Sequence, residues 1–189
     1  MKNKEIIKSI EKIVKKACQS PNNIYGPADW DYHVKAVVFF GKKLAKNQSL
    51  DVDLIEIACL LHDYAAISNG KFADTHHIVG ARMAEELLSQ YDYPKEKIEL
   101  VKKCILSHRG SIKSEKSTPE EQVVADADAM AHIENFKSLL YLAYVEKGLG
   151  IEEGSTWVLK KIERSWSKMS PQGKDMMKSK YESMLNCLE

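Results

Sequence analysis

The sequence predicts an all-α protein built as a single-domain helical bundle. Apolar residues recur at three- and four-residue spacing along most of the chain, which is typical of helices that bury one face. The nine glycines and five prolines fall in clusters between these segments, where they interrupt the helical pattern. The chain has 189 residues, of which 44% are hydrophobic, and it contains no internal repeat and no Pro- or Ser-rich linker. Residues 1–189 are therefore expected to form one domain around one core.

The first three expected helices lie in the first third of the chain. The first carries apolar residues from Ile6 to Ala17 and ends before Pro21, and the second begins near Asp31. The third runs from about residue 51 to 63 and is nearly all apolar. A helix that is apolar on every side is expected at the centre of the bundle.

The remaining helices follow a turn at residues 69–70. Asp74 or Thr75 is expected to cap the fourth helix, and the fifth runs over about 94–108. Further helical stretches are expected at about residues 117–146, 151–166 and 172–188. The stretch at 117–146 is long enough to be two helices or one bent helix.

Charge, hydropathy and cysteine content disfavour several functions. The formal net charge is +1, so no excess of basic residues favours nucleic acid or an acidic membrane as a partner. The apolar runs are far shorter than the roughly 20 residues of a membrane helix. The N-terminus lacks the apolar segment of a signal peptide, so we expect a cytoplasmic protein. The four cysteines form no Cys-x-x-Cys pair, and we expect reduced, mostly packed thiols.

Six histidines are the main candidates for chemistry. They fall on different expected helices or helix ends and are His33, His62, His76, His77, His108 and His132. Asp63 follows His62 at the end of an apolar run, where an unpaired buried charge costs on the order of several kcal/mol. A metal ion is one compensating partner, because imidazole nitrogens and carboxylate oxygens together suit Mn, Fe, Zn or Co. A single histidine is more often a hydrogen-bonded or surface residue, but the whole set favours a metal site.

Several segments resemble a known family. They are His33, the doublet His62-Asp63 within ACLLHDYAAI, the stretch HHIVGA at 76–81, CILSH at 104–108, and Asp128 within VVADADAM. Over roughly residues 30–135, this pattern resembles the His, His-Asp, Asp signature of the HD-domain metal-dependent phosphohydrolase superfamily. The resemblance implies a helical bundle of the HD-domain type. Its metal-site core would lie at about 30–135, and C-terminal helices at about 136–189 would pack on it.

The resemblance also implies a set of metal ligands and cofactors. The expected ligands are His33, His62, Asp63, His76, His108 and Asp128. Asp63 would lie at the centre of the first metal site, and His76 with His108 would hold a second metal that Asp63 bridges. The implied cofactors are one or two divalent ions from the set Mn, Fe, Co, Zn and Mg.

Alternatives stay open next to three of these residues. Asp126 also follows an alanine, but Asp128 fits the family pattern better, and Asp126 would then be a hydrogen-bonding partner or a cap. His76 fits the family spacing to the glycine of HHIVGA better than His77, which could substitute for it or contact substrate. His132, one turn beyond Asp128, could orient that carboxylate or simply pack.

Basic residues near these motifs are the expected phosphate-binding groups. Arg109 and Lys113 lie on the loop after the fifth helix, and we expect them to act with Asp63 in catalysis. A solvated basic loop is the alternative for the two cations. Arg82 and Lys35 are weaker candidates on the same reasoning.

The implied function is a metal-dependent phosphohydrolase. It would act on a small phosphorylated metabolite or a nucleotide through a metal-activated water. The alternatives are a di-iron oxygenase of the same superfamily and a non-catalytic, ligand-binding regulatory domain. Aromatic residues near the C-terminus are expected to pack between helices rather than stack on a base, and these are Tyr141, Tyr144, Trp157 and Trp166.

Overall fold

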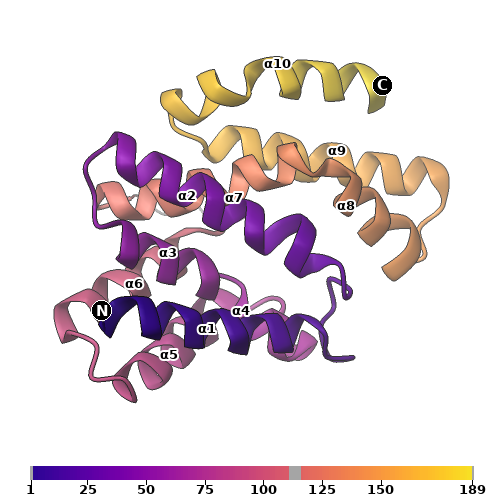
Figure 1. The fold of residues 1–189 in the computed structure, drawn as a ribbon. Coiled ribbons are helices and arrows are strands. Elements are labelled where there is room, and N and C mark those ends of the chain that lie inside the picture. The colour runs from indigo at the N-terminus through magenta and orange to yellow at the C-terminus, as the bar shows by residue number, and fades with distance from the viewer. Residues whose placement is uncertain (1, 111–115, 189) are drawn as a thin grey trace.

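The helices lie close to the positions that the sequence predicts. The structure, a computed structural model, describes residues 2–110 and 116–188, and these residues form helices and no strand (Figure 1). The α-helices are α1 (Lys2–Cys18), α2 (Lys35–Asn47), α3 (Val52–Leu61), α4 (Tyr64–Ser68), α5 (His76–Ser89), α6 (Lys95–Ser107), α7 (Pro119–Glu134), α8 (Phe136–Tyr141), α9 (Ile151–Lys168) and α10 (Pro171–Leu188). The all-α prediction is confirmed. No helix in the described ranges has the length and apolar character needed to span a membrane.

Short helical elements accompany several of the expected segments. The third expected helix corresponds to α3, and a separate short helix, α4, follows beyond residue 63, with Asp63 between them at φ −110° and ψ 8°. The expected stretch at 117–146 consists of α7, α8 and a π-helical turn, η3 (Leu142–Glu146). A second π-helical turn, η1 (Trp30–Val34), leads into α2, and a 3₁₀ turn, η2 (Gly70–Phe72), follows α4. Such π turns often occur at functional sites, and η1 contains His33.

The starts of α7 and α5 differ in how they are capped. Thr118 is extended at φ −136° and ψ 155°, and its side chain accepts a hydrogen bond from the Glu121 backbone N–H, which caps α7. The expected cap of α5 was wrong, because neither Asp74 nor Thr75 accepts such a bond. Thr75 is the residue before α5 and lies at φ −113° and ψ 10°, outside the extended region that aims a capping side chain at the helix start.

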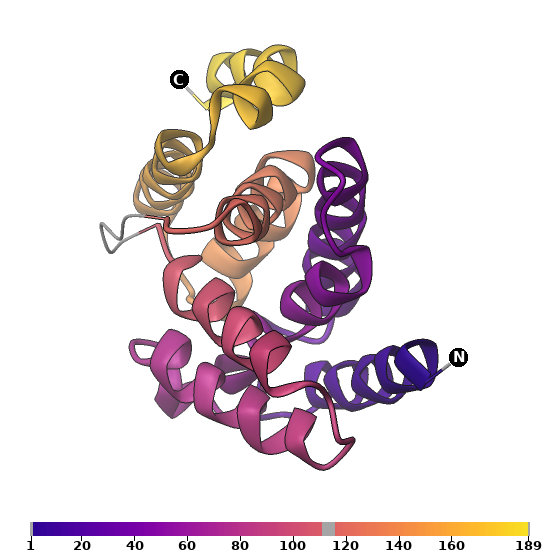
Figure 2. The ribbon, with the colours of Figure 1, turned by 90° about the vertical axis from the view of Figure 1, so that its left-hand side faces the viewer.

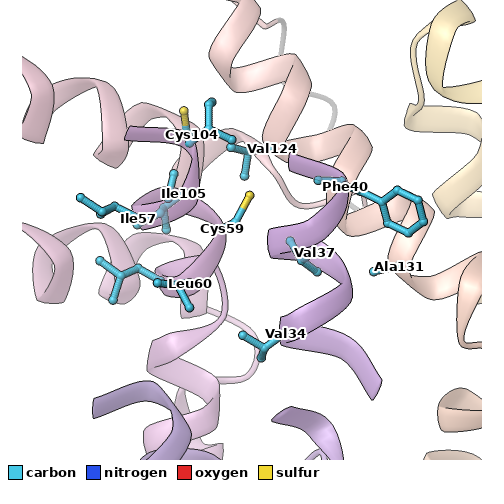
Figure 3. Packing of buried hydrophobic residues seen from close by; sticks show 14 of the residues in the cluster. Val34, Val37, Phe40, Ile57, Cys59, Leu60, Cys104, Ile105, Val124 and Ala131 are labelled. Carbon is cyan, nitrogen blue, oxygen red and sulfur yellow. The ribbon is translucent and has the colours of Figure 1, made fainter. Parts of the chain in front are cut away.

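The core forms around α7 and α3. α7 contacts α2, α3, α6, α9 and α10, and its residues from Val123 to Ile133 are all buried. α3 is almost entirely buried, as expected, and packs against α1, α2, α6 and α7. Figure 3 shows side chains of α2, α3, α6 and α7 meeting around Cys59. The cysteines are unpaired, and three of the four are buried, in agreement with the prediction of packed thiols.

The two C-terminal helices cover one side of α7. In two views at right angles, α9 and α10 lie on the opposite side of α7 from α1, α5 and α6 (Figure 2). Both α9 and α10 contact α7 directly. α9 is therefore the C-terminal element that lies beside any site formed on that face of α7.

α2 and α3 approach so closely that a side chain at Gly41 would collide with α3. A Cβ atom there would lie 3.1 Å from Ile55 Cγ2 and well inside contact distance of Cys59 Sγ. Overpacking of a core costs about 1–3 kcal/mol, whereas Ala is favoured over Gly in a helix by about 1 kcal/mol. Gly41→Ala is expected to lower the free energy of unfolding by up to about 2 kcal/mol, measured by urea denaturation of the metal-free protein.

Gly80 in α5 provides a matched control for this substitution. A Cβ atom there would meet Ile105 Cγ2 at 3.4 Å and Ala65 Cβ at 3.7 Å, which are ordinary contact distances. Gly80→Ala is expected to leave the stability unchanged or raise it. Equal losses of unfolding free energy in the two variants would show that the close contact with α3 is not what destabilises Gly41→Ala.

Candidate metal centre

The structure brings all six expected ligands together. Their positions are His33 in η1, His62 after α3, Asp63 between α3 and α4, His76 at the start of α5, His108 after α6 and Asp128 in the middle of α7. The five other than Asp63 are buried, and the side chain of Asp63 is 13% exposed. Residues more than 90 positions apart in the chain therefore meet at the ends of helices on one face of α7.

Three of the histidines use the same local hydrogen bond. In each, Nδ1 lies at hydrogen-bond distance from the carbonyl oxygen three residues earlier, at 2.8 Å for His62, 2.6 Å for His76 and 2.6 Å for His108. A carbonyl oxygen only accepts, so Nδ1 carries the proton and donates it. The other nitrogen, Nε2, is left to face the centre of the site, as in many metal-binding histidines.

His33, His62 and Asp128 form the first cluster. The Nε2 atoms of His33 and His62 are 3.2 Å apart. Asp128 Oδ1 lies 3.4 Å from the first of them and 3.9 Å from the second. One nitrogen from each ring and one carboxylate oxygen thus surround a common point, and all three atoms lie within 4.8 Å of one another.

Asp63, His76 and His108 form the second cluster. Asp63 Oδ1 lies 3.1 Å from His76 Nε2 and 3.4 Å from His108 Nε2, and the two nitrogens are 3.3 Å apart. The other oxygen of Asp63, Oδ2, faces the first cluster, 3.4 Å from His62 Nε2 and 3.9 Å from His33 Nε2. Asp63 therefore stands between the clusters with one oxygen directed to each.

The donor atoms of the two clusters fit divalent metal ions. Oδ1 of Asp63 and Oδ1 of Asp128 are buried and have no hydrogen-bond partner. In neutral imidazoles with a proton on Nδ1, the facing Nε2 atoms carry lone pairs and cannot hydrogen-bond to each other. A cation between the donors satisfies the nitrogens and the carboxylates together. Mixed nitrogen and oxygen donors of this kind suit Mn, Fe, Co or Zn.

The protonation of the histidines in the first cluster also indicates that a cation fits between the donors. Burial alone lowers the pKa of His62, but the Asp63 and Asp128 carboxylates outweigh burial and raise it to about 9. Burial lowers the pKa of His33 to about 4. In the metal-free site His62 is thus the protonated ring of this pair, beside the two carboxylates. A metal ion would take the place of this proton, so metal binding is expected to release it.

The two carboxyls of the site stay ionised. Burial by itself raises the pKa of a carboxyl, but the surrounding histidines, His62 first, hold the pKa of Asp63 well below its usual range. For Asp128, Lys168 and His132 outweigh burial in the same way.

Asp126 and Asp128 have separate roles. Asp126 Oδ1 accepts hydrogen bonds from the Ser170 backbone N–H at 2.8 Å and from Gln122 Nε2 at 2.7 Å, and its Oδ2 accepts from the Ser170 hydroxyl. It therefore anchors the connection between α9 and α10, whereas Asp128 points into the first cluster. Of the two aspartates left open by the sequence, only Asp128 takes part in the candidate metal centre.

The two remaining histidines differ in their positions. His132 stacks on His33 at 4.8 Å between ring centroids, and its Nδ1 lies 3.6 Å from Asp128 Oδ1 and 3.1 Å from Ser165 Oγ. It thus contacts ligand residues rather than simply packing in the core. His77 touches the ring of His76 edge-on at 5.8 Å and belongs to neither cluster.

The basic residues expected at the site are only partly there. Arg109 lines the cavity beside the clusters, donates to the Asp74 carbonyl oxygen and lies 3.8 Å from the Asp74 carboxylate. Lys113 falls within 111–115, outside the described residues. The expectation that Arg82 and Lys35 bind phosphate was wrong, because neither residue lines the cavity. Arg82 forms an exposed ion pair with Glu86, and Lys35 forms one with Asp31.

Sequence reasoning missed further residues of the site. The cavity over the clusters has a volume of about 700 Å³, and Asp29, Lys161, Arg164 and Lys168 line it. Lys168 contacts Asp128 Oδ2 and donates to the His108 carbonyl oxygen at 2.9 Å. Asp29 is buried, and burial, reinforced by Asp63, raises its pKa to about 7. The only available signal was the three- and four-residue spacing of Lys161, Arg164 and Lys168 along one expected helix.

The expectation for the aromatic residues was half right. Trp166 stacks on Tyr181 at 4.1 Å, and Tyr144 packs against Gly154, so both contribute to packing between helices. Trp157 and Tyr141 instead line the cavity.

The fold and this centre define a class of helical proteins with a His/Asp site able to hold divalent ions. The model of the HD domain family matches residues 30–133, which contain all six ligands. The chain belongs to the HD domain family. No protein with a curated description matches the sequence.

Solved structures share the fold. Bacillus subtilis YpgQ in complex with ADP has a TM-score of 0.75 and 17% identity, over 100% of this chain and 94% of that chain. The Lin1889 protein from Listeria innocua has a TM-score of 0.72 and 18% identity, with the same coverage. A predicted HD superfamily hydrolase from an uncultured Thermotogales bacterium has a TM-score of 0.59 and 23% identity, over 85% and 84% of the two chains.

The two clusters predict two metal ions per chain. Asp63 lies between the clusters, and His76 with His108 contributes only to the second. A His76→Ala/His108→Ala double variant is therefore expected to bind one ion where the wild-type protein binds two, measured by elemental analysis after metal titration. His77→Ala is the control and should retain both. A double variant with the wild-type number of ions would contradict the two-metal arrangement.

The separate roles of Asp126 and Asp128 generate a second prediction. Asp128→Ala should reduce metal binding at the first cluster. Asp126→Ala should leave metal content unchanged but lower the free energy of unfolding by about 1–3 kcal/mol, because it leaves the Ser170 and Gln122 donors without their acceptor. Elemental analysis and urea denaturation of both variants distinguish these effects. The assignment fails if Asp126→Ala loses metal while Asp128→Ala keeps it.

Proposed function

We propose that the protein is a metal-dependent phosphohydrolase that acts on a small phosphorylated metabolite or a nucleotide through a metal-activated water. The observation that carries the proposal is the pair of His/Asp clusters sharing Asp63 beneath a cavity that is also lined by cationic side chains. His33, His62, Asp63 and Asp128 would hold one ion, and Asp63 with His76 and His108 would hold the other.

The chemistry divides between the cofactor and the chain. Divalent ions, when bound, lower the pKa of water and neutralise charge on phosphoryl oxygens. Asp63 fixes the position of one cluster relative to the other, because each of its oxygens faces a different pair of histidines. His132 and Lys168 hold Asp128 in place from the other side.

Arg109 is suited to stabilise charge on the phosphoryl group. Its contacts with Asp74 fix the guanidinium at the cavity wall, directly after His108 in the chain. Guanidinium groups bind phosphate oxygens with paired, charge-assisted hydrogen bonds. Lys113 keeps the same expected role as a prediction from the sequence.

The cavity supports a substrate of nucleotide size. Its volume of about 700 Å³ falls within the range of about 300–1,000 Å³ usual for small-molecule sites. Tyr141 and Trp157 add aromatic surface to its wall. The similar fold of YpgQ, whose structure contains ADP, gives further support to a nucleotide.

A phosphatase screen with defined metals tests the proposal. The protein is stripped of metal, reconstituted with Mn, Fe, Co, Zn or Mg, and assayed without oxygen for phosphate release from nucleotides and sugar phosphates. Phosphate release that depends on the added ion is the expected result. A bound pair of irons, consumption of O₂ and no phosphate release would identify the di-iron oxygenase instead.

Two variants check the shared position of Asp63. Asp63→Ala is expected to abolish activity, because it removes an oxygen from both clusters, whereas His76→Ala removes one ligand from one cluster and should retain a measurable rate. The assay is steady-state phosphate release at saturating metal, with His77→Ala as the control. Equal residual rates for Asp63→Ala and His76→Ala would contradict a shared ligand.

A further inference from the structure

We infer that Lys161 and Arg164 of α9 form a second anion-binding position in the cavity, one that holds a phosphoryl group other than the one bound at the metal centre. The ligand class is then a compound with at least two linked phosphoryl groups. The inference deepens the proposed function and rests on it for the placement of the first phosphoryl group.

Two contacts show which face of α9 is directed toward the cavity. Ser165 Oγ lies 3.1 Å from Nδ1 of His132, and Lys168 contacts Asp128. Residues three and four apart on a helix lie on the same face. Lys161 and Arg164 precede this pair by that spacing, and both line the cavity.

Most of the charged groups in the cavity already have partners within the chain. Lys168 pairs with Asp128, and Arg109 contacts Asp74. The other cations lie over aromatic rings: Lys137 Nζ is 5.1 Å from the centre of the Tyr32 ring, and Lys147 Nζ is 5.4 Å from that of Trp157. Each of these four cations therefore already has a contact within the chain.

Lys161 and Arg164 are different. Within residues 2–110 and 116–188, neither side chain has an ion pair or a hydrogen bond. Burial lowers the pKa of Lys161, so its ammonium has lost water without gaining a partner of its own. A desolvated cation on a cavity wall is stabilised by an anionic ligand.

Lys161 and Arg164 lie further along α9 than the residue that contacts the metal centre. Lys168 marks the metal end of α9, and at a rise of about 1.5 Å per residue Arg164 and Lys161 lie about 6 and 10 Å further along the helix axis. A chain of linked phosphoryl groups can follow the helix from the metal centre to Lys161 and Arg164.

The charge balance favours the same ligand class. Ions bound at the two clusters would compensate Asp63 and Asp128, which leaves Lys161 and Arg164 as further positive charge near the centre. A monophosphate brings about two negative charges, all at the metal end. Additional phosphoryl groups bring negative charge to the place where the two unpartnered cations lie.

Equilibrium binding of a matched pair of ligands tests the inference without requiring turnover. The full chain, loaded with Mn²⁺, is titrated with AMP and with α,β-methylene-ADP, which carries a second phosphoryl group but no hydrolysable anhydride bond. Wild-type protein is expected to bind the ADP analogue at least about tenfold more tightly, as one charge-assisted contact contributes. Lys161→Gln and Arg164→Gln should each remove most of this preference and change the Kd of AMP less than about threefold.

Lys160→Gln is the matched control. Lys160 precedes Lys161 on α9, is exposed and does not line the cavity, so its loss should leave both Kd values unchanged. Arg164 is also exposed, so at least one of the two test variants is expected to fold, and metal content verifies the centre in each. Equal affinity of the wild-type protein for the two ligands would overturn the inference, as would equal losses for AMP and the ADP analogue or for Lys160→Gln and Lys161→Gln.

The result is independent of the phosphatase screen. If phosphate is released from monophosphates while the two ligands bind equally, the hydrolase proposal stands and the α9 position fails. If no substrate is hydrolysed but the preference for the ADP analogue depends on Lys161 and Arg164, the anion-binding position stands and the protein is a binding domain.

Discussion

The carboxylates of Asp63 and Asp128, both largely removed from water, impose the constraint on which the rest of the structure depends. A charge removed from water is strongly unfavourable unless cations or donors surround it. Four histidines lie within 4 Å of the Asp63 carboxylate, and Asp128 is approached by three histidines and Lys168. The helices must therefore end, bend or turn where they do so that these side chains converge.

Several irregularities of the fold follow from this requirement. The break between α3 and α4 places His62 and Asp63 side by side with different directions, because the chain leaves the helical conformation at Asp63. Both α3 and α6 end at a histidine whose Nδ1 donates to a carbonyl of the last turn. The carbonyl groups at a helix end lack partners within the helix. Here they accept a hydrogen bond from the histidine and also orient its imidazole ring.

The candidate metal centre and the proposed anion-binding position come from different parts of the chain. All six ligands lie within the residues that match the family model, whereas Lys161, Arg164 and Lys168 lie outside it on α9. Asp126 connects the two parts, because it anchors the turn that follows α9 while its neighbour Asp128 faces the metal centre. α9 therefore lines the cavity as well as covering the core.

The sequence by itself determined the helices, because helical periodicity is a local property. The candidate ligands His33, His62, Asp63, His76, His108 and Asp128 followed from the resemblance of their motifs to a known family. The family pattern favoured Asp128 over Asp126 but did not decide between them. Two residues apart on a helix, these side chains differ by about 200° in direction, and packing determines which of them faces the metal centre. Only the tertiary structure determined that the Thr75 side chain does not cap α5, and which face of α9 is directed toward the cavity. The backbone angles of Thr75 and the contacts of α9 with His132 and Asp128 depend on residues far away in the chain, which local sequence does not encode.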